Sequence, residues 1–416
     1  MRSEQGTVGG GGCRLVTMRI LFLTFQFPYP PDNGARIKTL SILEYLRPRH
    51  ELTVLCLTRR EPDDEQRRWA NAFGDVRWVL LDRGRNPLNL ARSYLSGVPL
   101  SVERNRSGEM SLLVAEALSG VEYHAVFADG WLMAQYLPER FGGLKLLHEH
   151  NAEYVIWERQ ARLERGILRK LLVGREAQRV RAYEADLLSW FDVVFAVSEQ
   201  DREALLAIGA DPARTRVLPN LPDPSLLEMP ALSFEGSQPV ILYFGTLSWQ
   251  PNIEGLERFI TQVFPLVRKE APQARLLIAG KDAPPALERL ARGTTGVDYM
   301  GPVADAETLY RKARVFVEAT RSGGGTKLKI LNAFARGLPV VASPEAAEGI
   351  DAIADAHLLV AGDDQTMAEE IASLLSDATR WQALSESGRA LVREKYVAEA
   401  AFSPLDRVLS GDRSRI

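Results

Sequence analysis

Short apolar runs alternate with longer amphipathic segments along almost the whole chain. The runs are rich in Val, Leu and Ile and apolar at consecutive positions, which is typical of strands buried on both faces of a sheet. Segments with helical periodicity lie between them, as at residues 36–46, 110–118 and 199–208. This alternation predicts parallel, doubly wound sheets. The apolar runs are residues 20–24, 52–57, 76–81, 125–128, 144–147, 193–197, 240–244, 275–279, 297–300, 315–317, 339–342 and 357–360.

The alternation stops between the sixth and seventh runs. Residues 218–224 read Leu-Pro-Asn-Leu-Pro-Asp-Pro and residues 235–239 read Glu-Gly-Ser-Gln-Pro, a composition typical of linkers. We therefore expect two α/β domains, at residues 18–222 and 223–397, after a glycine-rich tail, residues 1–17, that we expect to be disordered. Ligands of such sheets bind at the carboxyl ends of the strands, so two facing domains would form a cleft that closes by domain motion.

Composition places the chain among ordinary globular proteins. Of its 416 residues, 46% are hydrophobic and 25% charged, and the net charge is −3, so no whole-chain field would draw it to nucleic acid. Its two cysteines, Cys13 and Cys56, argue against a disulfide scaffold or a zinc ribbon and favour the reducing cytoplasm. No apolar run approaches the length of a membrane span.

The loop after the first strand lacks a dinucleotide-binding motif. A G-x-G-x-x-G sequence is expected there in an NAD or FAD enzyme, but only Gly34 is present, after three prolines. One interpretation is a substrate-facing loop with a close backbone approach at Gly34. The alternative is a plain turn with Asp32 or Asn33 as the helix cap.

The most informative loop follows the strand at residues 315–317. Three glycines, residues 323–325, precede a helix that opens with Lys327 and Lys329. Backbone N–H groups at a helix N-terminus bind anions, and glycines allow a close approach, so this glycine cradle predicts a diphosphate site. Cations at that end are unfavourable for the helix, so we expect a negative group to neutralise them. The alternative is a loop with solvated lysines; the spacing is not that of a P-loop.

Two histidines follow the strand at residues 144–147. His148 and His150 are two positions apart, so in an extended segment both face the same way. A metal site would need further ligands, and none is recognisable, so we expect no metal. The alternative to a functional role for His150 is a strand-end histidine that satisfies backbone groups.

These features together resemble a known family. The matching segments are residues 195–201 (Phe-Ala-Val-Ser-Glu-Gln-Asp), 217–220 (Val-Leu-Pro-Asn), 243–252, 301–303 and the glycine cradle through Val341. In this order they resemble the GT-B-fold glycosyltransferases of the large retaining "family 4" type, also called glycosyl transferases group 1. The resemblance implies two facing Rossmann-like domains and a last helix, within residues 398–416, that returns to the N-terminal domain.

The resemblance also implies the activity and its partners. It implies a hexosyl- or related glycosyltransferase of polysaccharide biosynthesis. The donor, a nucleotide-diphosphate sugar, would bind the C-terminal domain, and a glycan, lipid-linked or small-molecule acceptor would bind the N-terminal domain. Transfer would retain the anomeric configuration and need neither metal nor cofactor, because helix N-termini and lysines take the place of a divalent cation.

The site residues implied by this resemblance fall into three sets. The catalytic pair is His150 and Lys327, and the acceptor side comprises Gly34, Asn151 and Glu153. The donor-binding residues are Gly245, Thr246, Asn252, Gly280, Lys281, Val303, Gly324, Gly325, Thr326, Lys329 and Asn332.

The chain departs from the family pattern at four of these positions. Gly324 and Asn332 stand where two glutamates are usual, and Thr246 and Asn252 stand where many relatives carry Arg and Lys. Lys327 and Lys329 would compensate for the lost charge. Asn252 could instead be a helix cap after Pro251. The substituted glutamates keep open the alternative of a catalytically impaired scaffold that binds nucleotide sugars. A separate alternative is a GT-B-like nucleotide-sugar epimerase.

One segment of the N-terminal domain is strongly basic. Residues 156–183 carry eight Lys or Arg against three Glu, a net charge of +5, with helical periodicity. One interpretation is peripheral contact with an anionic membrane, at its cytoplasmic inner face, or with a lipid-phosphate acceptor. The alternative is a solvated helix face.

Overall fold

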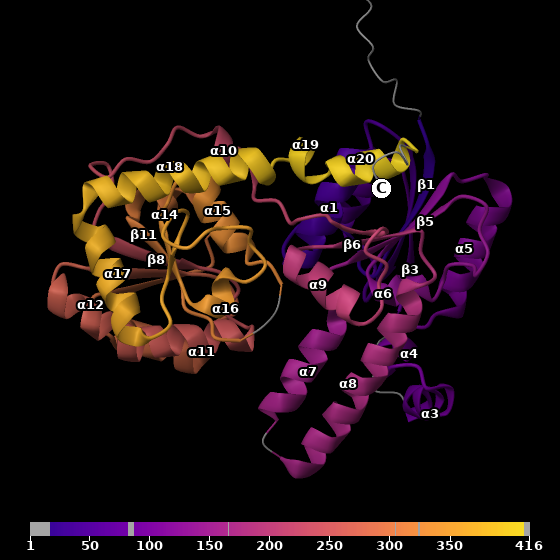
Figure 1. The fold of residues 1–416 in the computed structure, drawn as a ribbon, viewed down its shortest axis with the longest axis horizontal. Helices are drawn as coiled ribbons and strands as arrows, with labels where there is room; N and C mark the ends of the chain where they lie inside the picture. Colours follow the sequence, from indigo (N-terminus) through magenta and orange to yellow (C-terminus); the bar gives the residue numbers. More distant parts are fainter. Residues whose placement is uncertain (1–16, 82–86, 165, 304, 323–324, 412–416) are drawn as a thin grey trace, which may run out of the picture.

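The computed structural model describes residues 17–81, 87–164, 166–303, 305–322 and 325–411. Figure 1 shows two α/β domains side by side, each built around its own twisted parallel sheet. The predicted doubly wound architecture is therefore confirmed. The predicted disordered tail, apart from Thr17, lies outside the described residues.

The sheet of the N-terminal domain has seven described strands in the order β3-β2-β1-β4-β5-β6-β7. Every neighbouring pair in it is parallel. The edge strand β7 has only three residues and is half-exposed, so the search for buried apolar runs missed it. The strands are β1 (Arg19–Thr24), β2 (Glu51–Thr58), β3 (Asp75–Leu80), β4 (Ala125–Asp129), β5 (Leu144–Glu149), β6 (Val193–Ala196) and β7 (Thr215–Val217).

The sheet of the C-terminal domain has six described strands in the order β10-β9-β8-β11-β12-β13, again all parallel. The prediction of a strand at residues 357–360 was too long, because residues 354–357 form a turn closed by hydrogen bonds to Ile353. The strands are β8 (Val240–Phe244), β9 (Arg275–Ala279), β10 (Val297–Gly301), β11 (Val315–Glu318), β12 (Val340–Ala342) and β13 (Leu359–Val360).

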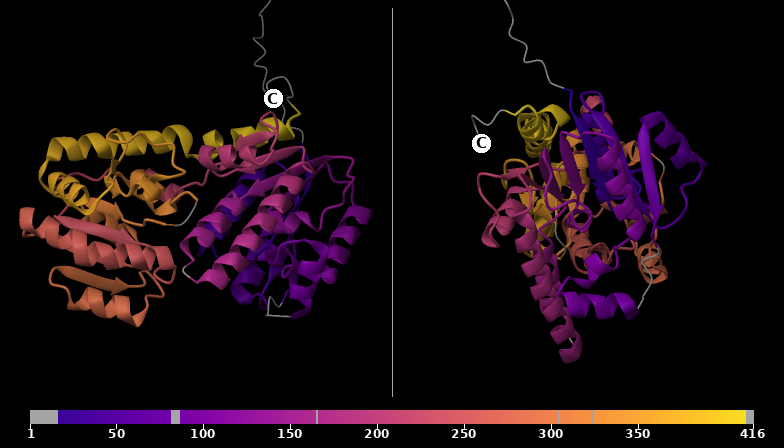
Figure 2. Two further views of the ribbon diagram at one scale, coloured as in Figure 1. Left: turned by 60° about the horizontal axis from the view of Figure 1, so that its bottom comes forward. Right: turned by 90° about the vertical axis from the view of Figure 1, so that its right-hand side faces the viewer.

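Helices cover both faces of each sheet (Figures 1 and 2). The helices before the linker are α1 (Gly34–Leu46), α2 (Asp64–Phe73), α3 (Pro87–Ser96), α4 (Leu100–Glu103), α5 (Gly108–Gly120), α6 (Trp131–Ala134), α7 (Glu153–Leu163), α8 (Ile167–Leu188) and α9 (Glu199–Ala207). Those after it are α10 (Pro224–Glu228), α11 (Gln250–Arg258), the π-helical turn η1 (Phe259–Val263), α12 (Phe264–Glu270), α13 (Pro285–Gly293), α14 (Glu307–Lys312), α15 (Leu328–Arg336), α16 (Pro344–Ala347), α17 (Asp364–Ser376), α18 (Ala378–Lys395), α19 (Ala398–Ala401) and α20 (Ser403–Leu409).

Strand order fixes where each domain can bind a ligand. In both sheets the first strand of the domain lies between the second strand and the fourth, so the order reverses between β1 and β4 and between β8 and β11. Ligands of open α/β sheets bind at the carboxyl ends of the strands at such a switch point. The loops after β1, β4, β8 and β11 are therefore the candidate site.

The chain crosses between the domains twice, at the linker and after α18. Figure 1 shows α18 along the C-terminal domain and α20 on the N-terminal one. Phe402 and Leu405 pack in the same buried cluster as Ile42 and Leu46 of α1. The expected returning helix is thus present, as two short helices.

Lys38 contacts both segments that cross between the domains, the linker and the returning C-terminal helices. Its buried Nζ donates hydrogen bonds to the carbonyl oxygens of Leu218 at 2.8 Å and Pro219 at 2.7 Å, and lies 4.7 Å from the centre of the Phe402 ring. In the described part of the chain, no helix is both long and apolar enough to cross a bilayer.

Candidate active site at the cleft

The C-terminal domain holds Lys329 in a network of buried polar groups. Its Nζ pairs with the Glu318 carboxylate and lies 3.1 Å from the Tyr243 hydroxyl and 3.0 Å from Oδ1 of Asn252. Glu318 ends β11 and is fully buried, and its carboxylate supplies a negative charge beside Lys329. A diphosphate that binds Lys329 would share this ammonium with Glu318.

Asn252 is a connecting residue and not a helix cap. It lies inside α11, whose N-cap position is Trp249, and its Nδ2 donates to the Thr246 carbonyl at 2.7 Å while its Oδ1 accepts from Lys329. The cap interpretation is therefore wrong. Asn252 joins the loop after β8 to the helix that carries the lysines.

Lys327 lies at the N-cap position of α15, one residue before the helix begins. The side chain is buried, and its ammonium lies 5.4 Å from the centre of the Trp249 ring and 3.4 Å from the Gly325 carbonyl. Burial lowers the pKa of Lys327 below its usual value, and the charge of Lys329 adds to this, while Glu318 opposes it. Two ammonium groups at one helix N-terminus favour an anion between them.

A cavity of about 330 Å³ lies at the same strand ends and opens between the domains. Asp32 of the first loop lies opposite, and its backbone oxygen is 3.2 Å from Nζ of Lys281. The structure thus brings much of the predicted donor set together. Five predicted donor-binding residues line the cavity, namely Gly245, Thr246, Gly280, Lys281 and Val303.

The remaining predicted donor residues have structural partners or cannot be placed. Oδ1 of Asn332 accepts a hydrogen bond from the Asp223 backbone N–H at 2.9 Å and so contacts the linker. The Thr326 hydroxyl donates to the Gly349 carbonyl at 3.0 Å. Gly324 lies outside the described residues.

The N-terminal domain contributes a buried cluster of one aspartate and two histidines. Asp129 ends β4, and its Oδ1 lies 2.9 Å from Nδ1 of His148 and 3.0 Å from Nε2 of His150. Its Oδ2 accepts hydrogen bonds from the hydroxyls of Thr24, at 3.1 Å, and Thr39. Sequence reasoning missed Asp129, although an aspartate that ends an apolar strand just before a glycine was visible.

Burial and charge set the ionisation of this cluster. Burial alone would raise the pKa of Asp129, but the charge of His150 and hydrogen bonds from both histidines hold it well below the usual range. Burial lowers the pKa of His148 to about 3 against the hydrogen bond to Asp129, so the His148 ring is neutral near pH 7. His148 is fully buried, whereas His150 is partly exposed beside Phe25. The structure therefore gives the two histidines different environments.

The cluster also offers metal-ligand atoms. One ligand atom each from Asp129, His148 and His150 lie within 4.8 Å of one another, the one such group of three in the described part of the chain. Each histidine already lies at hydrogen-bond distance from the aspartate, and a tetrahedral site would need a fourth ligand.

Acidic residues lie beneath this cluster, where α7 begins. Glu184 of α8 accepts hydrogen bonds at 2.9 Å from the backbone N–H groups of both Glu153 and Tyr154 and so caps α7. Burial raises the pKa of Glu184 to about 8 and that of Glu153 to about 7, and it raises the pKa of Glu149 well above its usual value. Asn151, by a hydrogen bond, and His150, by its charge, oppose the shift at Glu153.

The two half-sites meet across the cleft. A methyl group built on Gly325, whose φ is +72°, would lie 2.5 Å from Oδ1 of Asn151, so only glycine permits this approach. Nη2 of Arg159 on α7 lies 3.0 Å from Oε2 of Glu348 in the opposite domain. The expected pairing of a glycine cradle with the His150 loop is therefore present in space.

The close approach of the Gly34 backbone to a substrate stays a prediction. α1 begins at Gly34 with Asn33 as its N-cap, and a methyl group on Gly34 would make an ordinary 3.8 Å contact with Leu328 of α15. The turn interpretation is correct for the cap, although the loop does face the opposite domain.

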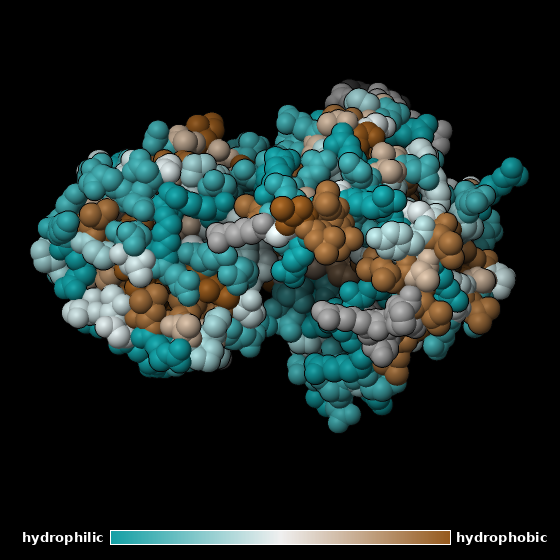
Figure 3. Space-filling model, turned by 90° about the horizontal axis from the view of Figure 1, so that it is seen from below, coloured by the Kyte–Doolittle hydropathy of each residue, from teal (hydrophilic) through white to brown (hydrophobic). Residues whose placement is uncertain are grey.

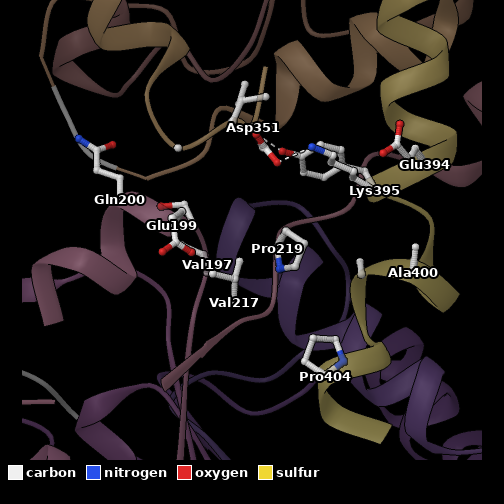
Figure 4. Close-up of a pocket in the computed structure, with 15 residues that line it drawn as sticks. Val197, Glu199, Gln200, Val217, Pro219, Asp351, Glu394, Lys395, Ala400 and Pro404 are labelled. Carbon is white, nitrogen blue, oxygen red and sulfur yellow. Dashed lines mark hydrogen bonds and ion pairs between the residues drawn. The ribbon is translucent and has the colours of Figure 1, made fainter. Parts of the chain in front are cut away.

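A further cavity, of about 490 Å³, lies on the side of the cleft where the chain crosses (Figure 4). Glu199 and Gln200 of α9 line one wall, and Asp351 and Lys395 line the other, joined by an ion pair at 2.6 Å. This cavity lies at the hinge and contains the Asp351–Lys395 ion pair, so it is distinct from the site that contains Lys327 and Lys329.

Comparison with known proteins identifies the two domains. Residues 33–221 match the family model of the glycosyl transferase 4-like domain, and residues 238–377 match that of the glycosyl transferases group 1. The chain belongs to the group 1 glycosyltransferases. The expected family resemblance is thus confirmed, and the GT-B architecture accounts for the two facing sheets.

One relative and several solved structures are similar to the chain over nearly its whole length. The chain is 23% identical to the "Uncharacterized 44.6 kDa protein in cps region" of Klebsiella pneumoniae, over 93% of this chain and 98% of the relative. HepE from Anabaena, solved in complex with UDP and glucose, has a TM-score of 0.64 and 15% identity, covering 95% of this glycosyltransferase and 100% of HepE. Sucrose-phosphate synthase from Thermosynechococcus elongatus has a TM-score of 0.66 and 19% identity, covering 95% and 99% of the two chains.

Proposed function

We propose that this glycosyltransferase moves a sugar from a nucleotide-diphosphate donor to a glycan, lipid-linked or small-molecule acceptor, with retention of configuration. One observation carries the proposal: the helix N-terminus with Lys327 and Lys329 lies across the cleft from the His150–Asn151 loop, and Asn151 meets Gly325 between them. Such a juxtaposition suits a ligand that is anionic at one end and reactive at the other. The HepE complexes with UDP and with UDP-glucose make UDP-sugars the first donors to test.

In this proposal each domain has a separate task. Lys327, Lys329 and the start of α15 bind the diphosphate and stabilise the charge that grows on it as it leaves. His150 orients the sugar near the reacting carbon once the domains close, while Asp129 fixes the imidazole through Nε2. Transfer then replaces the bond from the anomeric carbon to the phosphate oxygen by a bond to the acceptor hydroxyl oxygen, whose proton goes to the departing phosphate.

We propose further that transfer needs no divalent metal and takes place in the cytoplasm, in polysaccharide biosynthesis. The two ammonium groups supply at the diphosphate the positive charge that a cation would supply. The buried free thiol of Cys56 suits a reducing compartment.

A panel of nucleoside diphosphates tests the donor half. We expect one of them, UDP first, to raise the melting temperature by several degrees in EDTA at concentrations far above its dissociation constant. The matching nucleotide sugar should be hydrolysed slowly or transferred, and proton NMR should find the first-formed product with the donor's anomeric configuration.

Each alternative has its own outcome in this experiment. Binding without sugar release or transfer would favour a scaffold, and conversion of the sugar without loss of nucleotide would favour an epimerase. Activity lost in EDTA and restored by manganese or magnesium would contradict the metal-free proposal. Metal analysis of the protein as purified, together with His148→Ala, would then ask whether the Asp129 cluster holds the ion.

A further inference from the structure

The free end of the α7–α8 hairpin exposes large apolar side chains. Seen from below in Figure 3, brown side chains gather over this projecting part of the N-terminal domain. Solvent-exposed leucines and isoleucines at this density are unusual for a surface that stays in water. The exposed fractions are 69% for Leu163, 83% for Ile167, 71% for Leu168, 66% for Leu171 and 52% for Leu172.

The apolar residues of α8 form one stripe with a cation on each side. At about 100° per residue, Ile167, Leu168, Leu171 and Leu172 span roughly 140° of the helix surface. Arg169 lies beyond one edge of this stripe and Lys170 beyond the other, each by about 60°. Apolar stripes flanked by basic residues are typical of helices that lie in the interface of a bilayer.

Several basic residues that form no described ion pair lie near the same end of the hairpin. Of the basic residues at 156–183, Arg159, Arg162, Arg179 and Arg181 all pair with glutamates. Within the described part of the chain, Arg169, Lys170 and Arg175 form no ion pair. Three cations of the segment that form no described ion pair therefore lie on the first half of α8, beside the leucines.

Helix α3 extends the apolar surface. Figures 1 and 2 show it beside the hairpin at the same end of the N-terminal domain. Arg179 fastens it to α8 through Ser93, whose hydroxyl oxygen lies 2.9 Å from Nη2. Tyr94 and Leu95 of α3 are 53% and 89% exposed.

We infer that the hairpin end and α3 bind the surface of an anionic phospholipid bilayer. The leucine stripe enters the headgroup region, and Arg169, Lys170 and Arg175 contact lipid phosphates. Anionic lipid is the partner that satisfies the apolar stripe and its flanking cations together. The inference rests on this surface alone and not on the proposed transfer reaction.

A cavity between the hairpin and α11 links this surface to the active site. It has a volume of about 890 Å³, and its lining runs from Leu163 and Arg169 of the hairpin to Trp249 and Ser322 beside the glycine cradle. A membrane-bound protein would therefore present its cleft to a lipid-linked acceptor along this path.

Vesicle flotation with the full chain tests the inference. We expect binding to vesicles of phosphatidylcholine mixed with phosphatidylglycerol, little binding to phosphatidylcholine alone, and release at high salt. Arg169→Ala/Lys170→Ala should lower the partition coefficient about tenfold or more, the scale expected for two cations near an anionic surface. Leu168→Ser/Leu171→Ser should lower it similarly. Thermal unfolding verifies that each variant is folded.

Matched substitutions elsewhere serve as controls. Leu112→Ser/Ile353→Ser removes two side chains of similar exposure, 73% and 65%, and Arg311→Ala/Lys312→Ala removes an adjacent basic pair on α14. Both should bind like the wild type. Donor hydrolysis without vesicles should be unchanged in Leu168→Ser/Leu171→Ser, which separates membrane binding from the transfer reaction.

Three results would overturn the inference. They are equal binding to neutral and anionic vesicles, hairpin variants that bind as well as their controls, and hairpin variants that dissociate an oligomer in light scattering while vesicle binding is absent in every form. The last would assign the surface to a second copy of the chain.

Discussion

At the residue scale, Asp129 organises the reactive end of the N-terminal domain. Its carboxylate accepts from two threonine hydroxyls and lies within 3.0 Å of a ring nitrogen of both His148 and His150. Because both partners of its Oδ1 are histidines, Asp129 can fix the ring orientation and tautomer of each. Of these two histidines only His150 reaches solvent, so the same aspartate contacts one fully buried ring and one partly exposed ring.

We predict that His150→Ala lowers the transfer rate by about 10²–10⁴-fold, the scale of a lost catalytic group. The affinity for the free nucleoside diphosphate should stay within about threefold, since His150 lies in the domain opposite the lysines and meets the sugar only after closure. Steady-state kinetics and calorimetry measure the two effects.

His148 supplies the control. His148→Ala removes a fully buried ring and leaves part of Asp129 unpaired, so it should lower the melting temperature more than His150→Ala does. Normal turnover in His150→Ala, with turnover lost in folded His148→Ala, would move the functional role to the other histidine. If both variants turn over normally, only the donor half of the proposal survives.

We predict different consequences for the two lysines of the cradle. Lys327→Ala should weaken binding of the nucleoside diphosphate by about 1.5–3 kcal/mol, the range of a charge-assisted hydrogen bond. We expect the binding loss to be larger for Lys327 than for Lys329, since Lys327 lies nearer the helix start and Glu318 already shares the Lys329 charge. Calorimetry on both variants measures this.

The loss of folding stability should be larger for Lys329→Ala than for Lys327→Ala, the reverse of the order expected for binding. Lys329→Ala leaves the buried Glu318 carboxylate without the ammonium that pairs with it, which costs about 3–5 kcal/mol in comparable buried pairs, and we expect Lys327→Ala to cost less. The double variant Glu318→Gln/Lys329→Met should recover much of that loss. If Lys329→Ala is as stable as the wild type, the buried pair does not hold the loop as the structure shows.

Sequence alone was enough to find the residues whose neighbours form a motif. Lys327, Lys329 and His150 follow strands in recognisable loops, and the structure places them on facing sides of one cleft. Asp129 and Glu318 were missed because each is a single acid at the end of an apolar strand, and its partners are revealed only by folding. The contact of Asn332 with the linker was not foreseen for the same reason, since its partner Asp223 is 109 positions away.

At the scale of elements, the central strands of each sheet were easier to predict than the strands at the sheet edges. Buried apolar runs located the central strands of both sheets within a residue or two, because burial on both faces leaves a continuous signal. Strand β7 and the ends of β13 lie at sheet edges, where that signal fades. The basic segment was correctly predicted to be helical, but its division into α7 and α8 was not foreseen.

The hairpin depends on a buried acid that caps one of its helices. Glu184 of α8 accepts the first N–H groups of α7, close to Glu153, Glu149 and Asp201. Burial therefore raises the pKa values of Glu149, Glu153 and Glu184 in the folded state above their values in the unfolded state. Stability from such groups is complete below the unfolded pKa and is lost as pH rises through the folded pKa.

We predict that the free energy of unfolding falls as the pH rises from about 6.5 to 8.5. The pKa of Glu153 is about 7 and that of Glu184 about 8, so in the lower part of this window the folded state still holds protons that the unfolded state has lost, and the fall flattens above about pH 8. His148 does not interfere, because above its ordinary pKa of about 6.5 it is neutral in both states. One titrating group contributes at most about 1.4 kcal/mol per pH unit.

Denaturant titrations at several pH values measure the slope of the free energy of unfolding against pH. Glu184→Gln keeps one acceptor oxygen and cannot ionise, so its slope should be shallower than that of the wild type. Glu203→Gln, on the exposed side of α9, is the control. A wild-type stability that rises over this window would contradict the raised pKa values.

At the scale of the whole molecule, the domains are joined on one side and only touch on the other. Lys38 fastens both crossings at the hinge. Across the cleft, the Arg159–Glu348 pair is partly exposed, and such pairs contribute little stability. This arrangement allows the cleft to open while the hinge stays intact, and the Asn151–Gly325 approach is one of the points where the two domains meet.

We predict that Gly325→Ala holds the cleft open. Its methyl group would lie 2.5 Å from Oδ1 of Asn151, so the domains must separate or the loop must shift. Turnover should fall because His150 no longer reaches the bound sugar, and small-angle X-ray scattering with bound nucleoside diphosphate should give a larger radius of gyration than the wild type. Affinity for the nucleotide alone should change less than turnover.

The control must separate this contact from backbone strain. Gly97 has a φ of +76°, close to the +72° of Gly325, but a methyl group there meets nothing within 4 Å. Gly97→Ala should therefore incur the same backbone penalty, about 1 kcal/mol, without changing turnover or shape. Combining Gly325→Ala with Asn151→Gly removes the opposing oxygen and should restore the compact shape, while the loss of the Asn151 side chain keeps turnover low. If Gly325→Ala is as compact and as active as Gly97→Ala, the cleft does not close through this contact, and closure must be sought at the Arg159–Glu348 side instead.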